Sequence, residues 1–206
     1  MNYIHLKESL KDFVVFSLPD IRQIEPTFDR RRLFEWQKKG YIKKLRRGYY
    51  AFSDINFSQE VLFAIANRLY APSYISLESA LSYYGLIPEG VYQLTSVCSR
   101  KTIQFETSVG PFSYQTVKPN LLFGYELISQ GSRSYKIASR EKAILDYLYL
   151  HPQIVQESDF HEWRFNAHDF LQRANVDLYQ KYAISFGNET FSRQAMMLLD
   201  RFRKES

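Results

Sequence analysis

Cysteine is almost absent from this sequence, since Cys98 is the single one among 206 residues. No internal disulfide can form, which excludes disulfide-stabilised secreted scaffolds and fits a reducing compartment. Cys98 stands in the β-like segment LTSVCSR, and we expect it to be a small core residue. Glycine and proline are also sparse, at 8 and 7 residues, and they form no repeat or low-complexity tract that would indicate a linker.

Long apolar segments are missing as well. The first residues, MNYIHLKESLKDF, are charged and amphipathic and contain no apolar signal core. No run approaches the roughly 18 apolar residues that a membrane helix needs. We therefore expect a cytoplasmic protein without a membrane partner.

The sequence also lacks the motifs of common enzymes. No phosphate-binding loop, dinucleotide fingerprint or nucleophile elbow occurs. His161 and His168 are seven residues apart, whereas a zinc-binding helix presents two histidines one turn apart with an acid between them. Glu141 and Asp146 are five residues apart and diverge around a helix. We predict that the protein is not an enzyme and holds no metal and no cofactor.

What the sequence does contain is an uneven distribution of charge. Residues 1–52 hold 12 of the 27 Lys and Arg but only 6 of the 22 Asp and Glu, which leaves +6 there and −1 in the remainder. Between residues 30 and 47 there are nine Lys or Arg and one acid. This asymmetry indicates a basic N-terminal module on a nearly neutral body.

The N-terminal module is predicted to begin with three helices. Apolar residues at helical spacing indicate the first, and Ser17 and Pro19 mark the start of the second. Thr27 is expected to cap the third helix, Phe28 to about Lys39, which Gly40 ends.

A β-hairpin is predicted directly after the third helix. The aromatic and β-branched runs YIKKL and GYYAF are joined at Arg46–Gly48, where glycine permits a tight turn. Three helices followed by a hairpin are the order of a winged helix-turn-helix, which we assign to residues 1–56.

The third helix has two faces of opposite character. At about 100° per residue, Leu33 and Trp36 share one face, while Arg31, Glu35 and Lys38 form a stripe on the other. An apolar face toward the core and a basic face toward solvent are typical of a recognition helix in the DNA major groove. We predict that Arg31 and Lys38 contact DNA there.

The predicted hairpin carries the remaining basic residues. Lys43, Lys44, Arg46 and Arg47 are expected to neutralise backbone phosphates of double-stranded DNA. The alternative for this basic stretch is a solvated flank without a ligand, or a protein-interaction module that meets an acidic partner.

Residues 57–206 are predicted to form an α+β domain. The segments QEVLFAIANRLY, SYISLESALSYYGLIP and SREKAILDYLYLH read as helices, and residues 91–117 and 121–137 as strands. We expect a small antiparallel sheet flanked by helices, followed by a mostly helical segment at 157–205.

Three segments of the chain together resemble a known family. KKGYIKKLRRGYYAF at 38–52, SYISLESALSYYGLIPE at 73–89 and YKIASREKAILDYLYL at 135–150 look like segments of the AbiEi-type antitoxins of bacterial type IV toxin–antitoxin systems. Their order and spacing fit over about residues 15–150, whereas residues 151–206 match no motif of the family.

The resemblance implies a regulator with two roles. The winged helix would bind inverted repeats in its own promoter and repress the operon, and the C-terminal domain would antagonise a nucleotidyltransferase-like toxin without forming a stable complex with it. The DNA-contacting role carries over to the helix and hairpin residues named above, and no catalytic residue carries over.

The second and third segments also have a packing interpretation. Ser76 and Ser139 as helix caps and Gly85 as a stop account for most of their regularity. The polar positions that this leaves are candidates for a partner surface, namely Glu78, Tyr83, Arg140 and Lys142. A third hypothesis, a nucleic-acid-processing enzyme, depends only on the scattered acids and histidines of the α+β domain.

Overall fold

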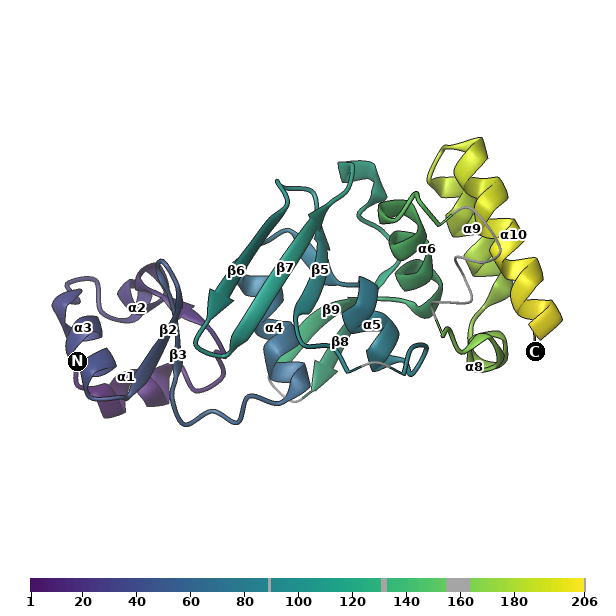
Figure 1. Cartoon of the computed structure of the whole chain (residues 1–206). Helices are drawn as coiled ribbons and strands as arrows, with labels where there is room; N and C mark the ends of the chain where they lie inside the picture. The colour runs from purple at the N-terminus through teal and green to yellow at the C-terminus, as the bar shows by residue number, and fades with distance from the viewer. Residues whose placement is uncertain (89, 131–132, 155–163, 206) are drawn as a thin grey trace.

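The computed structural model describes residues 1–88, 90–130, 133–154 and 164–205 of the chain. The fold is a mixed α+β fold, as predicted, with two separate sheets. Figure 1 shows the N-terminal elements at one end, the larger sheet in the middle and the last helices at the other end.

The N-terminal part consists of three short helices and a three-stranded sheet in the order β1-β3-β2. The pairings β1–β3 and β2–β3 are both antiparallel, and the hairpin turn contains Gly48 at φ 86°. The elements are α1 (Tyr3–Ser9), β1 (Phe16–Ser17), α2 (Leu18–Ile24), α3 (Arg31–Lys38), β2 (Ile42–Arg46) and β3 (Tyr49–Phe52).

The start of α2 follows the prediction from sequence, whereas the start of α3 does not. The backbone N–H and the hydroxyl of Ser17 both donate to Asp20 Oδ2, at 2.7 and 2.6 Å, which closes the first turn of α2. The prediction that Thr27 caps α3 is wrong, because α3 begins at Arg31. Asp29 Oδ1 accepts the Arg31 N–H at 2.9 Å instead.

The larger part is built on a six-stranded sheet in the order β6-β7-β5-β4-β9-β8. Our expectation of a small antiparallel sheet is wrong, because β4–β9 and β5–β7 pair in parallel. The other pairings are antiparallel. The strands are β4 (Ser73–Ile75), β5 (Leu94–Cys98), β6 (Ile103–Thr107), β7 (Gly110–Thr116), β8 (Tyr125–Gln130) and β9 (Arg133–Ala138).

Helices pack around this sheet and extend beyond it. The helix α4 contacts β4 and β9, and α5 and α6 pack against each other near β5. The last helices pack on α6 and on one another (Figure 1). The helical elements are α4 (Gln59–Leu69), α5 (Leu77–Tyr83), η1 (Pro119–Leu121), α6 (Arg140–Leu150), α8 (Ala167–Arg173), α9 (Val176–Ser185) and α10 (Glu189–Glu205).

Two hydrophobic clusters hold the fold together. The smaller one joins α1, α2, α3 and the hairpin through residues such as Leu33 and Trp36. The larger one fills the rest of the molecule and includes Cys98, which is buried as expected. Leu45 and Ala51 of the hairpin belong to the larger cluster, so the hairpin is covered on two sides.

None of the helices in the described ranges combines the length and the apolar character that crossing a membrane requires.

Candidate nucleic-acid interface

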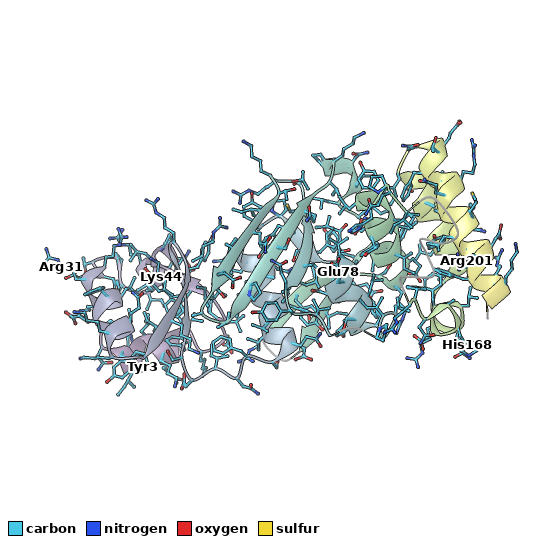
Figure 2. All side chains as sticks on the ribbon, viewed as in Figure 1. Tyr3, Arg31, Lys44, Glu78, His168 and Arg201 are labelled. Atoms are coloured by element: carbon cyan, nitrogen blue, oxygen red, sulfur yellow. The ribbon has the colours of Figure 1, made fainter. Side chains whose placement is uncertain are left out.

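The helix α3 places its apolar and basic residues on opposite sides, as the sequence predicts. Leu33 and Trp36 are buried, and the Trp36 ring lies 5.6 Å from the ring of Phe28. Arg31 and Lys38 are exposed. Figure 2 shows the Arg31 side chain projecting into solvent at the outer end of the N-terminal part. The packed face fixes the helix, and the opposite face is free to meet a ligand.

An exposed aromatic ring accompanies these cations. Phe34 is 61% exposed, and the Lys38 ammonium lies 4.7 Å from its ring centroid. A single exposed apolar side chain is ordinary on a protein surface, so Phe34 belongs to the candidate interface only because it lies beside Lys38. Sequence reasoning missed Phe34, although it stands next to Leu33 and therefore points about 100° away from it.

The hairpin divides its basic residues between solvent and the interior. Lys44 and Arg47 are exposed. Lys43 is half-buried, with its ammonium 4.8 Å from the Phe57 ring centroid. The pairing register shifts between Lys44 and Arg46, so that the residue between them is the extra residue of a bulge. Figure 2 shows Lys44 nearer to the larger part than Arg31 is.

Arg46 is directed toward the larger part of the molecule. Its guanidinium carbon lies 4.3 Å from the Phe105 ring centroid and 5.4 Å from that of Tyr70, and Nη1 is 3.5 Å from the Leu69 carbonyl oxygen. Arg100 stacks on the same Tyr70 ring at 4.1 Å. Arg46 therefore joins the hairpin to β6 and α4, which distinguishes it from its neighbour Arg47.

Four of the predicted DNA-contacting residues are thus exposed together on α3 and the hairpin, namely Arg31, Lys38, Lys44 and Arg47. In the part of the chain that the structure describes, none of the four forms a salt bridge. Exposed cations without a salt bridge attract a polyanion such as DNA. Each contact between such a cation and a phosphate releases a counterion that the DNA had held.

The prediction that Lys142 lies on a partner surface is wrong, because its side chain is 0% exposed. The ammonium donates to Asp146 Oδ1 and, at 2.9 Å, to the Tyr74 hydroxyl. Asp146 Oδ2 accepts from the hydroxyls of Tyr74 and Ser76, at 2.8 and 2.9 Å. The rings of Phe123 and Phe186 lie 4.8 and 4.9 Å from the ammonium.

Burial dominates the electrostatics of this Lys142–Asp146 pair. Desolvation lowers the pKa of Lys142 and raises the pKa of Asp146, while the attraction between the two groups opposes both shifts. The arrangement connects β4, the cap of α5 and α6 in the interior, so we interpret it as a structural element and not as a binding surface.

Of the other three candidates for a partner surface, Tyr83 and Arg140 both contact the Tyr84 ring, whereas Glu78 lines a pocket. Tyr83 is at the surface, with its hydroxyl 3.3 Å from that of Tyr135. Arg140 is partly buried, with its guanidinium carbon 4.6 Å from the Tyr84 ring centroid. Tyr83 also contacts the Tyr84 ring, at 5.1 Å. Glu78 is partly buried and lines a pocket of the larger part.

The candidate acids and histidines of the sequence are dispersed. Glu141 Oε1 accepts the Asn175 N–H at 2.7 Å, and Asp146 is held in the buried pair. His168 Nε2 is 2.9 Å from Gln172 Nε2, and His161 lies outside the described residues. Within the described ranges, no group of three or more His, Cys, Asp or Glu is placed to hold a metal ion.

The exposed cations of α3 and the hairpin are therefore the main indication of function in this molecule. A scan of known protein-family models and a search of curated proteins both return no match to this chain.

Proposed function

We propose that residues 1–56 form a winged helix-turn-helix that binds double-stranded DNA, and that the protein is a transcriptional regulator. The observation that carries this proposal is the set of exposed cations without a salt bridge in the described part of the chain, with Arg31 and Lys38 on α3 and Lys44 and Arg47 on the hairpin that follows it. The buried Leu33 and Trp36 support it, because they leave the opposite face of α3 free.

In this proposal α3 is the recognition helix. An α-helix with its side chains is about 10–12 Å across, which fits a major groove about 12 Å wide. Arg31 and Lys38 would contact base edges, and Phe34 would supply the apolar contact that a thymine methyl group accepts. Lys43, Lys44 and Arg47 would contact phosphates, which position the protein without reading sequence.

We further propose that the regulator is an autorepressing antitoxin of a type IV toxin–antitoxin system. The resemblance of residues 38–52, 73–89 and 135–150 to AbiEi-type antitoxins supports this role. The DNA would be the inverted repeats of its own promoter. The larger part of the chain would antagonise a nucleotidyltransferase-like toxin, and it would do so without a stable complex.

DNA binding is tested by fluorescence anisotropy of the full chain on its own upstream DNA over a range of salt concentrations. The three cations assigned to phosphates, Lys43, Lys44 and Arg47, predict a slope of log K against log salt of about −3. Arg47→Ala should make that slope shallower by about 1 for every duplex. Lys181→Ala, an exposed cation on α9, is the matched control and should leave it unchanged. A slope near zero, or no binding, would reject the proposal.

Sequence reading is tested with Arg31→Ala. The variant should lose about 1–3 kcal/mol of discrimination between the operator and a scrambled duplex, while binding to the scrambled duplex changes little. Equal losses on both duplexes would assign Arg31 to the phosphates and not to a base.

The antitoxin role is tested by growth of cells that express the nucleotidyltransferase-like reading frame next to this gene. Co-expression of the chain should restore growth. The double variant Arg31→Ala, Arg47→Ala should lose repression of the promoter but still restore growth, because the two roles lie in different parts of the chain. Absence of such a reading frame, or of rescue by the wild type, would contradict the role.

A further inference from the structure

The six-stranded sheet has two edge strands, β6 and β8, and they differ in what lies beside them. The edge strand β6 is on the side of the N-terminal part (Figure 1), where the hairpin strand β2 contacts it. The edge strand β8 pairs with β9 on its inner side. Its residues Tyr125, Glu126, Leu127 and Ser129 are exposed. Within the described ranges, β8 is therefore the open edge of the sheet.

Two hydrogen bonds establish which backbone groups of β8 face outward. The Ser139 N–H donates to the Gly124 carbonyl oxygen at 2.9 Å, so the carbonyl group just before β8 points toward the chain of β9. The Lys136 N–H of β9 donates to Asn67, away from β8, and its ladder partner Leu127 therefore also points away from β9. Because the direction alternates along a strand, the N–H and C=O groups that face outward are those of Tyr125, Leu127 and Ser129. In the described part of the chain these outward groups form no hydrogen bond.

The strand β8 lacks the features that usually prevent an edge strand from pairing. Natural edge strands are very short, or they carry lysine, proline or a bulge. The six residues of β8, YELISQ, include no Lys, Arg or Pro, and their register with β9 is regular throughout. The single charge is Glu126. An edge of this kind can add a further strand through its backbone groups.

The outward groups of β8 are complementary to those of a second copy of β8. In an antiparallel pair with a twofold axis at Leu127, Leu127 faces the same residue of the second copy and Tyr125 faces Ser129. Every outward N–H of one strand then donates to an outward C=O of the other. A register centred on Glu126 would set two carboxylates directly opposite each other, which destabilises a sheet, whereas the register centred on Leu127 sets Ile128 opposite Glu126.

The exposed apolar side chains of β8 meet in the same register. Leu127 is 62% exposed and Tyr125 is 39% exposed, and both lie on one face of the sheet because they are two residues apart. The Tyr125 ring stacks on the buried Tyr74 ring, with 5.1 Å between the centroids, which fixes its position. Diagonal neighbours on paired strands are about 7–8 Å apart, so each tyrosine reaches the leucine pair at the axis. Pairing of the two edges therefore also removes apolar surface from water.

We propose that the protein forms a homodimer by antiparallel pairing of the two β8 edges, centred on Leu127. The contact is isologous and closes at two copies, because it uses the open edge of each sheet. One short strand from each copy forms a small contact, so the association is weak and reversible. Two copies related by a twofold axis match the symmetry of inverted repeats in DNA. This match rests on the proposed function, whereas the pairing itself does not.

The test is sedimentation equilibrium of the full chain without DNA, from about 5 to about 500 µM. The mass of the wild type should rise from that of one chain toward that of two. Leu127→Glu and Leu127→Lys each set two like charges opposite each other at the axis, and each should weaken dimerisation at least about tenfold. An equimolar mixture of these two variants should dimerise more strongly than either variant alone, because opposite charges then meet. Ile184→Glu, at a 67% exposed position of α9, is the matched control and should dimerise as the wild type does.

The melting temperature of each variant verifies its fold. If a Leu127 variant unfolds, Ser129→Pro replaces it, because it removes an outward N–H and no hydrogen bond between β8 and β9. The proposal is rejected if the wild type keeps the mass of one chain at about 500 µM, or if folded variants dimerise as tightly as the wild type. A mixture that dimerises no better than its components rejects the register at Leu127. DNA binding is measured on Arg31 and Arg47, so either proposal can fail without the other.

Discussion

Removing the buried ammonium by Lys142→Met should destabilise the protein severely. The side chains of Lys142 and Asp146 are both 0% exposed, so the substitution leaves a carboxylate in the interior with only the hydroxyls of Tyr74 and Ser76 as donors. Removing one partner of a buried ion pair costs about 3–5 kcal/mol. Domains are stable by about 5–15 kcal/mol, so the loss is a large share of the total.

The companion substitution Asp146→Leu should cost a similar amount, because it leaves the ammonium unpaired. In the double variant no charge remains buried. Because neither group then has to be desolvated on folding, the free energy of unfolding gains about 1–4 kcal/mol relative to a protein with a buried pair. The hydroxyls of Tyr74 and Ser76 then lose their acceptor, at about 1–3 kcal/mol each. The double variant should therefore be no less stable than either single variant, with a coupling energy above about 3 kcal/mol.

The assay is urea unfolding of all four proteins, followed by circular dichroism. The free energies of unfolding close a double-mutant cycle if the transitions stay cooperative. The reasoning is refuted if each single variant loses less than about 1 kcal/mol of unfolding free energy. It is also refuted if the loss in the double variant equals the sum of the two single losses, because a buried pair of opposite charges is coupled.

Arg46→Ala should lower the free energy of unfolding by about 1 kcal/mol in urea titrations, because its guanidinium leaves two aromatic rings; an unchanged midpoint would contradict this. Gly124→Ala should lower the free energy of unfolding by more than about 1 kcal/mol, seen as a lower thermal midpoint. Gly124 has φ 68°, and an added methyl group would lie 2.9 Å from a ring carbon of Tyr182. Burial raises the pKa of the Tyr114 and Tyr179 hydroxyls, so the folded chain keeps protons that the unfolded chain releases above pH 10. Stability should be intact below that pH and fall above it by roughly 1.4 kcal/mol per pH unit for each tyrosine. Ionisation of Tyr114 or Tyr179 near pH 10 in the folded chain, followed by NMR of those two rings, would contradict the assignment.

Local patterns predicted the N-terminal elements and the faces of α3. The placement of apolar residues on one face of α3 and basic residues on the other follows from helix geometry alone. Leu33 and Trp36, on the apolar face, are both buried. The start of α3 was three residues too early in the prediction from Phe28, because the Phe28 ring packs in the core before the helix begins. Capping signals such as Thr27 compete at neighbouring positions, and tertiary packing decides between them.

Long-range pairing accounts for what the sequence did not predict. The strand β4 has three residues and lies in the middle of the sheet, where its parallel contact with β9 joins Ile75 to Ile137. The alternation along one strand specifies its two faces but not which distant strand it pairs with. The sequence makes Lys142 a surface candidate because the packing interpretation leaves this polar position over, although Asp146 four residues later indicates a pair on one helix face.

Of the candidate interface, the exposed cations were predictable and the role of Arg46 was not. Arg31 and Lys38 follow from helix periodicity, and Arg47 stands at the predicted turn, where side chains face solvent. Arg46 meets Phe105 and Tyr70, which are distant in sequence, and the bulge before it changes the side on which it lies.

The hairpin also limits how this molecule can be divided. Leu45 and Ala51 pack in the larger hydrophobic cluster, and Ser108 donates its hydroxyl to the Lys44 carbonyl oxygen at 3.4 Å. An excised fragment of residues 1–56 would present those apolar side chains to water and would release Arg46 into solvent as an additional cation. DNA sequences selected with such a fragment would therefore reflect a domain that is more basic and more apolar on its surface than the same residues are in the intact protein.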